Sequence, residues 1–233
     1  MTSSPQSPSQ FPQDAAAPQP AIRIDIVSDV MCPWCIVGYR QLEAALATLD
    51  TGAYIRWHPF ELNPSMPPDG QNLTEHIAEK YGATKAQSAE NRARLTDLGR
   101  GLGIDFRFSD DSRIVNTFAA HQLLDWAELA NLQHPLKLAL FEAHFTQARD
   151  VSDPDVLADV AASVGLDRDA AREVLASGSH AAQVRSRQDF WTSRGISGVP
   201  SMVFGGKYLL TGAQGTATYV QMLTKVLSEK DAA

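Results

Sequence analysis

The chain has 233 residues, of which 44% are hydrophobic and 20% charged, a balance typical of a globular protein with a sizeable core. Its 27 acidic and 20 basic residues give a net charge of −7, and Lys and Arg are not clustered, so we expect no nucleic-acid partner. No stretch approaches the roughly 20 consecutive apolar residues of a membrane span, so we expect no membrane partner either.

The first 21 residues are rich in Pro, Gln and Ser and contain no Lys, no Arg and no continuous apolar run. Such a segment cannot bury enough surface to offset the entropy lost on ordering, so we expect residues 1–21 to form a disordered tail. A secretory signal would need a basic start followed by about 7–15 apolar residues. Because neither is present, we expect a cytoplasmic protein whose folded part begins at residue 22.

A β-α-β unit is predicted at the start of the folded part. Residues Ile22–Val27 alternate apolar and polar side chains, as a half-buried strand does. Apolar positions then recur at helical spacing up to Leu49, and Pro33 suits the first helical turn, where its missing N–H costs nothing. A second strand is predicted over Ala53–Phe60. The sequence Cys-Pro-Trp-Cys, residues 32–35, therefore lies where the first strand meets the helix.

The middle of the chain is predicted to be helical, and its end to form a hairpin and a helix. Helical periodicity recurs over Thr74–Tyr81, Lys85–Leu102, Ile114–Ala130, Pro135–Gln147, Asp153–Val164, Arg168–Ala176 and His180–Ser193. Two short apolar runs, Ser201–Phe204 and Lys207–Leu210, then flank a Gly-Gly turn and predict a β-hairpin. A last helix is predicted over Thr216–Leu227.

This order of elements predicts an α/β protein with a thioredoxin-like layout. A large all-helical insertion separates its β-α-β half from its β-β-α half. The strands on either side of the insertion must share one sheet. We therefore expect one thioredoxin-like domain in two parts, residues 22–67 and 196–229, with the helical insertion at residues 68–195.

The two cysteines of the chain, Cys32 and Cys35, lie on one face at the start of a predicted helix. Free N–H groups and the dipole of a helix start favour an anion, which lowers the pKa of a thiol there. We therefore expect Cys32 to be the more exposed and more acidic thiol, which acts as the nucleophile. Cys35, a turn deeper, would be the resolving thiol that releases a mixed disulfide.

Three other interpretations of the cysteine pair remain open. A zinc site usually has four ligands, and the six histidines show no HxxxH-type pair that would complete one. A structural disulfide that closes a loop of about four residues is worth only roughly 2 kcal/mol, which a chain of this length hardly needs. Two incidental core cysteines would leave the strand–CPWC–helix context unexplained. We therefore favour redox chemistry and predict no metal site.

Several motifs together resemble the DsbA-like thioredoxin superfamily, and within it the FrnE-like branch of dithiol-disulfide oxidoreductases and isomerases. They are CPWC after Ser28-Asp29, PFELNP at residues 59–64, Asn116-Thr117 with Ala120-His121, GISGVP at residues 195–200 and TGAQ at residues 211–214. The motifs span about residues 22–227 in this order, and their combination is more specific than CPWC alone.

The resemblance implies a thioredoxin fold with a helical insertion and a cis peptide bond between Val199 and Pro200. It also implies that this loop lies beside the cysteines, where the backbone of Val199 would pair with an extended partner segment as an added strand does. Without the resemblance, an ordinary turn before Ser201 explains the loop equally well. The best-known DsbA proteins carry Pro-His between their cysteines, whereas this chain carries Pro33-Trp34, which argues against a strongly oxidising role.

Five further residues are weaker candidates. Asp25 and Asp29 flank the pair, and either would accept the proton that the resolving thiol loses. We favour the simpler alternatives, a solvated strand residue for Asp25 and a carboxylate at the helix start for Asp29. Trp34 would either contact the partner or pack on the helical insertion. Asn116 and His121 would either line the cleft or serve as a capping and a core residue of their helix.

The sequence thus predicts a cytoplasmic thiol-disulfide oxidoreductase or isomerase that uses the Cys32–Cys35 disulfide as its redox group and binds no cofactor. Its partners would be protein thiols and disulfides or a small thiol, with glutathione as a candidate co-substrate. The chief alternative is a glutathione-dependent isomerase or transferase on the same scaffold, but those relatives often carry Ser at the first cysteine position. A third hypothesis is a non-enzymatic peptide-binding module that uses the cleft around Pro200.

Overall fold

The centre of the structure is a four-stranded sheet of order β2-β1-β5-β6. The computed structural model describes residues 22–231, so the expected tail at residues 1–21 lies outside the described residues. The strands of the sheet are β1 (Ile22–Ser28), β2 (Ala53–Pro59), β5 (Ser201–Phe204) and β6 (Tyr208–Thr211). β1 pairs in parallel with β2, whereas β5 pairs antiparallel with both β1 and β6. Strands from both parts of the chain therefore share one sheet, as predicted.

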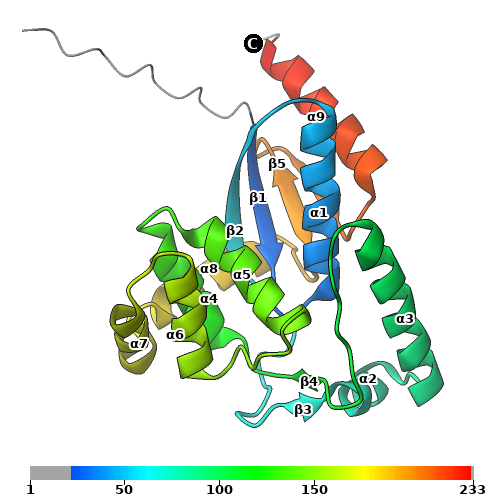
Figure 1. The fold of residues 1–233 in the computed structure, drawn as a ribbon. Coiled ribbons are helices and arrows are strands. Elements are labelled where there is room, and N and C mark those ends of the chain that lie inside the picture. Colours follow the sequence, from blue (N-terminus) through cyan, green and yellow to red (C-terminus); the bar gives the residue numbers. More distant parts are fainter. Residues whose placement is uncertain (1–21, 232–233) are drawn as a thin grey trace, which may run out of the picture.

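Two helices, α1 (Pro33–Thr48) and α9 (Thr216–Asp231), lie against each other on one face of the sheet (Figure 1). Alternate residues of a strand point to the same face, and Ile24 and Ile26 of β1 pack in one core with Phe204 of β5. Because β1 is hydrogen-bonded on both sides, its C-terminal end holds the following loop and the start of α1 in a fixed place.

A helical insertion separates the two halves of the sheet. Its helices are α2 (Leu73–Tyr81), α3 (Lys85–Gly101), α4 (Phe118–Glu128), α5 (Gln133–Phe145), α6 (Pro154–Ser163), α7 (Arg168–Ser177) and α8 (Ala181–Thr192). Helices α4 to α8 form one group beside the sheet, and α2 and α3 stand on the other side of it (Figure 1). The predicted α/β fold with a helical insertion is confirmed.

The insertion also contains a small sheet that the periodicity did not predict. Strands β3 (Gln71–Asn72) and β4 (Arg113–Ile114) pair antiparallel. The predicted helix over Ile114–Ala130 is wrong at its start, because α4 begins at Phe118, whose backbone N–H donates to the side-chain oxygen of Asn116. The apolar residues just before that turn are buried in the core of the insertion, and this burial explains their apolar character without a helix.

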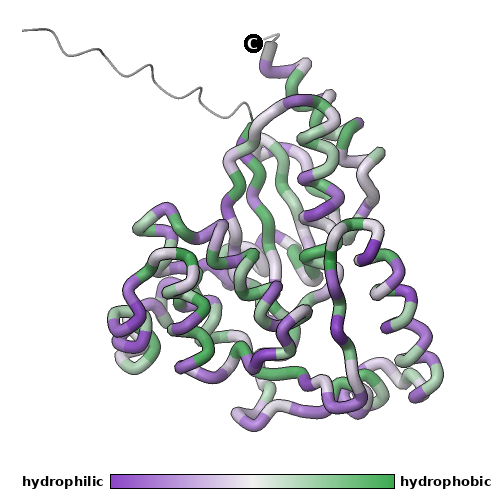
Figure 2. The backbone as a smooth tube through the Cα atoms, in the orientation of Figure 1, coloured by the Kyte–Doolittle hydropathy of each residue, from purple (hydrophilic) through white to green (hydrophobic). Residues whose placement is uncertain are grey.

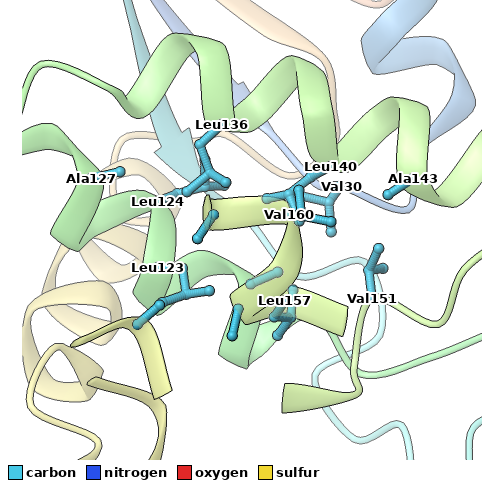
Figure 3. Packing of buried hydrophobic residues seen from close by; sticks show 14 of the residues in the cluster. Val30, Leu123, Leu124, Ala127, Leu136, Leu140, Ala143, Val151, Leu157 and Val160 are labelled. Carbon is cyan, nitrogen blue, oxygen red and sulfur yellow. The ribbon is translucent and has the colours of Figure 1, made fainter. Parts of the chain in front are cut away.

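The structure has two hydrophobic cores, one under α1 and α9 and one among α4 to α7. Figure 3 shows the second core, where Leu124 of α4, Leu140 of α5 and Val160 of α6 pack together. Val30, from the loop between β1 and α1, lies among these side chains, two residues before Cys32. The loop that leads to the first cysteine is therefore anchored in the core of the insertion.

Helices α2 and α3 contribute little to either core. The residues of α3 are mostly hydrophilic, whereas those of the central strands β1 and β5 are mostly hydrophobic (Figure 2). Within α3, which the structure describes completely, the buried residues are Ser88, Leu95 and Gly99, and the equally well described α2 has none. These two helices therefore present most of their side chains to the space around them.

Candidate active site

The first cysteine stands at the N-terminus of α1. Cys32 is the N-cap residue with extended backbone angles, φ −88° and ψ 111°, and Pro33 lies in the first turn as predicted. No side chain caps this end of the helix. The backbone N–H of Cys35 donates to the carbonyl oxygen of Cys32 at 3.0 Å. The uncapped helix start therefore offers a positive potential to a thiolate.

The two thiols differ in exposure. Both cysteines are free; Cys32 is 4% exposed, whereas Cys35 is fully buried. The peptide bond between Val199 and Pro200 is cis, as the resemblance implied, and the carbonyl oxygen of Val199 lies 3.7 Å from Cys32 Sγ. Trp34, between the cysteines, is 46% exposed. The outer sulfur thus borders the Pro200 loop, and the inner sulfur does not reach the surface.

Each thiol of the reduced pair affects the ionisation of the other. Burial opposes the ionisation of Cys35, but a hydrogen bond from Cys32, the charge of Lys137 and a hydrogen bond from Ser28 lower the pKa of its thiol. The same hydrogen bond to Cys35, with burial, raises the pKa of the Cys32 thiol well above its ordinary value. The titrations of the two thiols are therefore linked, and the expectation that Cys32 is the more acidic thiol stays a prediction.

Asp29 lies in a buried network beneath the pair. Its carboxylate accepts hydrogen bonds from the backbone N–H groups of Leu62 at 2.7 Å and Met31 at 3.3 Å. His121 Nε2 lies 3.6 Å from Asp29 Oδ1. Burial opposes ionisation, but His121, the Leu62 N–H and the charge of Lys137 hold the pKa of Asp29 below its usual value. Asp29 is therefore a carboxylate that fixes the loop before the first cysteine, and it does not cap α1.

A cavity of about 980 Å³ opens beside the outer sulfur. Cys32, Trp34 and Val199 line it, and so do Tyr81 of α2 and Leu98 of α3. Cys35 does not line it. A partner sulfur that enters this cavity therefore meets Cys32 first.

Neither Asn116 nor His121 lines this cavity, in contrast to the cleft role considered for them. His121 is buried, with Nε2 3.0 Å from the carbonyl oxygen of Phe60, and belongs to the network of Asp29. The side-chain amide of Asn116 donates to the carbonyl oxygen of Met66 at 3.4 Å and its oxygen caps the start of α4. Both residues therefore have structural partners behind the site.

Asp25 is buried, so the solvated position that we favoured for it is wrong. Its carboxylate binds His58 Nε2 at 2.8 Å and Arg23 at 2.7 Å. Burial opposes ionisation, but these two partners hold the pKa of Asp25 below its usual value. Asp25 and His58 line a second cavity of about 810 Å³, to which the cysteines do not belong. The partners of Asp25 are thus His58 and Arg23.

Sequence reasoning missed Lys137, a lysine of α5 that is only 1% exposed. Lysines in helices usually face water, so the residue type gave no signal. The spacing of the helix did give a signal. Four residues recur every four positions and therefore lie on one face of the helix: Gln133, Lys137, Phe141 and Phe145. Both phenylalanines are core residues, so the lysine of that face had to be buried as well.

Across residues 22–231, His, Cys, Asp and Glu side chains form no group of three or more that could hold a metal ion. None of the helices in that range is long and apolar enough to cross a membrane.

Comparisons with known proteins found similar sequences and structures over most of the chain. The family model of the DSBA-like thioredoxin domain matches residues 23–224. A probable DsbA oxidoreductase from Streptomyces coelicolor is 31% identical, with a TM-score of 0.84 over 89% of this chain and 91% of that one. Uncharacterized protein YwbO of Bacillus subtilis (strain 168) is 24% identical over 210 residues, 90% of this chain and 99% of YwbO. The cytosolic disulfide reductase DsbM from Pseudomonas aeruginosa, in a structure with GSH, is 17% identical with a TM-score of 0.61 over 88% of this chain and 99% of DsbM, and it supports the fold alone.

Proposed function

The chain belongs to the DSBA-like thioredoxin domain family, and from this premise we propose that it is a dithiol-disulfide oxidoreductase or isomerase. Cys32 is the nucleophile and Cys35 the resolving thiol. The observation that Cys32 lines the cavity whereas Cys35 does not carries the proposal. Cys32 borders the cavity and the carbonyl oxygen of Val199, whereas Cys35 is fully buried and interacts with Ser28 and Lys137.

The exchange takes place in two steps. First, the Cys32 thiol loses its proton to the solvent, and the Cys32 thiolate attacks one sulfur of a partner disulfide R–S–S–R′. A bond forms between Cys32 Sγ and the sulfur of R, the partner S–S bond breaks, and R′–S⁻ leaves and takes up a proton from the solvent. Second, the Cys35 thiol loses its proton to the solvent, and the Cys35 thiolate attacks Cys32 Sγ and expels R–S⁻, which takes up a second proton from the solvent. Two electrons pass to the partner, and the pair becomes a disulfide.

We propose that Val199 and Pro200 bind the partner. The backbone at Val199 would pair with an extended partner segment as an added strand does. The segment would then lie next to Cys32 Sγ, with which the partner sulfur forms a bond. The exposed ring of Trp34 would contact the side chains of that segment. Protein thiols and disulfides fit this mode of binding, and a small thiol such as glutathione fits the cavity as a co-substrate. The redox group is the Cys32–Cys35 disulfide itself, without a bound cofactor.

Two further features of the proposal concern domains and location. We propose that residues 22–67 and 196–229 form the thioredoxin-like domain and residues 68–195 the insertion, which assigns the four-stranded sheet to the first and α2 to α8 to the second. We also propose the cytoplasm as its location, where the similar DsbM is described as a cytosolic reductase. A reducing compartment keeps such a dithiol available as an electron donor.

The test is a thiol titration with and without reductant, followed by insulin reduction with the wild type and with Cys32→Ser. Loss of two titratable thiols on oxidation, together with insulin reduction that needs Cys32, supports the proposal. Glutathione-dependent turnover of a small molecule without disulfide exchange would favour the isomerase or transferase alternative. Peptide binding with neither activity would favour the binding module.

A further inference from the structure

One face of helix α3 lines the cavity that opens beside Cys32. Four of the residues that α3 contributes are spaced three or four positions apart, as members of one helix face are: Asn91, Arg94, Leu95 and Leu98. The side chain of Leu98 is exposed, and so is the ring of Trp34, which lines the same cavity. This wall of the cavity therefore offers apolar surface and one guanidinium group to a molecule that enters it.

The position of this helix face is fixed relative to the cysteine pair. The ring of Phe106 packs so closely on α3 that a Cβ at Gly99 would lie 2.5 Å from it. Phe106 belongs to the same hydrophobic core as Cys32. About two turns earlier in α3, the Arg92 guanidinium donates to Thr74 Oγ1 at 2.9 Å and so ties the helix to α2. The residues of α3 therefore keep a constant place along the wall of the cavity.

Arg94 differs from the other arginines of the cavity, because it has no ion pair and no side-chain hydrogen bond within residues 22–231. The others are bound by acceptors elsewhere in the chain: Arg92 by Asp110, Arg107 by Asp105, Arg113 by the carbonyl oxygen of Asp69, and Arg149 by Asp159. Arg94 is exposed, and a guanidinium is always charged and matches the two oxygens of a carboxylate. It is therefore available to an anion that enters the cavity.

The acidic residues of the cavity do not neutralise Arg94. Asp97 pairs with Arg100 at 2.9 Å, and Asp150 accepts hydrogen bonds from its own loop. Asp111 forms no ion pair in the described part of the chain, but it belongs to the loop before β4 and not to α3. The wall formed by α3 thus carries an uncompensated positive charge next to apolar side chains.

We propose that Arg94 is a specificity-determining residue: its guanidinium binds a carboxylate of a polypeptide whose cysteine is exchanged at Cys32. The substrate class is then a protein segment with an aspartate or glutamate within a few residues of its disulfide, and with an apolar side chain that contacts Trp34 and Leu98. An extended segment advances about 3.3 Å per residue, so a few residues suffice to cross the cavity. The inference rests on the proposed function and deepens it by naming the substrate class.

The charge of the whole chain makes this expectation distinctive. A net charge of −7 repels acidic partners at long range. Without a local cation at the site, basic peptides would therefore react faster than acidic ones. A preference for acidic peptides requires positive charge at the cavity itself.

The experiment compares the reduced wild-type chain with Arg94→Gln and Lys85→Gln. Lys85 lies at the exposed start of α3 and does not line the cavity, so Lys85→Gln removes a positive charge of the same helix away from the site. The substrates are short peptides with a single cysteine, held as a disulfide with the neutral 2-thiopyridyl group, and with Glu, Gln or Lys a few positions away on either side. Exchange releases 2-thiopyridone, whose absorbance gives the second-order rate constant.

At the position that reaches Arg94, Glu peptides should react with the wild type about fivefold faster than Lys peptides, the upper range for an exposed ion pair. Arg94→Gln should remove this preference, whereas Lys85→Gln should keep it. High salt should also remove it in the wild type, because the screening length is only about 3 Å at roughly 1 M salt. A wild type that favours Glu at no position, or a preference that survives in Arg94→Gln, would overturn the inference.

The proposed function and this inference can fail separately. A wild-type chain that forms no Cys32–Cys35 disulfide with any of the peptides overturns the proposed function, and this inference with it. A chain that forms the disulfide and reacts with all peptides at the same rate overturns this inference alone. Oxidised glutathione serves as a further substrate: a rate that depends on Arg94 with glutathione but with none of the peptides would contradict a protein partner.

Discussion

The two sides of the cysteine pair are built differently. On the outer side, Cys32 meets an open cavity, the exposed ring of Trp34 and the Val199 carbonyl. On the inner side, Cys35 is enclosed, and the groups that act on it include Ser28 and Lys137. The outer side is suited to contact with changing partners, whereas the inner side has fixed charges. We therefore expect that binding and redox chemistry can be altered separately in this chain.

Replacing the cysteines should have the largest effect. Cys32→Ser removes the sulfur that a partner reaches, so disulfide exchange should be abolished. Cys35→Ser leaves the nucleophile but removes the group that expels the partner, so mixed disulfides should accumulate and be visible by mass spectrometry. Mixed disulfides trapped on Cys35 in the Cys32→Ser variant would reverse the assignment of roles.

The buried network on the inner side of the site can be tested at Asp29. Asp29→Asn removes the carboxylate of a buried charged network, which should cost roughly 3–5 kcal/mol in the free energy of unfolding at pH 7. Because the pKa of Asp29 is lowered in the folded protein, its carboxylate stabilises the fold above pH about 3.9, and this contribution is lost as the pH falls through the folded-state pKa. The difference between variant and wild type should therefore shrink below pH 4 in urea titrations.

Asp25→Asn is the matched control, since Asp25 is also buried and also has a lowered pKa, but lies by another cavity. Asp25→Asn should lower the free energy of unfolding without changing the thiol titration. Asp29→Asn should change both the free energy of unfolding and the thiol titration. Identical thiol titrations in the two variants would show that Asp29 does not act on the pair.

The contact between α1 and the Pro200 loop can be tested at Gly38. A Cβ at this position would lie 3.2 Å from Pro200 Cγ and 3.2 Å from Met202 Cε. Gly38→Ala should therefore cost about 1–3 kcal/mol in stability and slow exchange by displacing the loop that borders Cys32. Gly52→Ala, where a Cβ meets no atom within 4 Å, should be nearly neutral. Chemical denaturation and insulin turnover measure both effects, and equal behaviour of the two variants would contradict the close packing.

Changes confined to the outer side should have the smallest effects. Trp34→Ala should lower kcat/KM for a protein substrate about fivefold, or roughly 1 kcal/mol, and leave unfolding unchanged within about 0.5 kcal/mol. Tyr54→Ala removes an equally exposed ring that does not line the cavity, and should leave kcat/KM unchanged. The same loss in both variants would mean that Trp34 has no special place at the partner surface.

The features predictable from the sequence are those set by neighbouring residues. Strand, CPWC and helix follow each other closely, so alternation, the position of Pro33 and helical spacing locate the cysteines at the start of α1. The hairpin was found because its strands flank a Gly-Gly turn. In contrast, β4 pairs with a strand about forty residues earlier, and two residues leave no periodicity from which to infer it.

The inner side of the site could not be read from local patterns. Asp25 was expected in water because it alternates with apolar residues on a strand, yet helix α8 packs against the sheet and Asp25 is buried with His58. Likewise, Lys137 is about a hundred residues from Cys35 along the chain, yet its charge acts to lower the pKa of the Cys35 thiol. The helix start can be predicted from neighbouring residues, whereas a charge on a distant helix cannot.

The most direct test of the account is the reduction potential of the Cys32–Cys35 pair, measured by equilibration with glutathione. The helix start and Lys137 favour the thiolate, but Trp34 replaces the histidine that would donate a charge-assisted hydrogen bond worth on the order of 1.5–3 kcal/mol, or about 30–65 mV. We therefore predict one two-electron transition between about −120 mV, the strongly oxidising end, and about −270 mV, that of thioredoxin. A potential at or above −120 mV would show that the thiolate is as well stabilised without the histidine, and cysteines that stay reduced in every buffer would contradict the redox function itself.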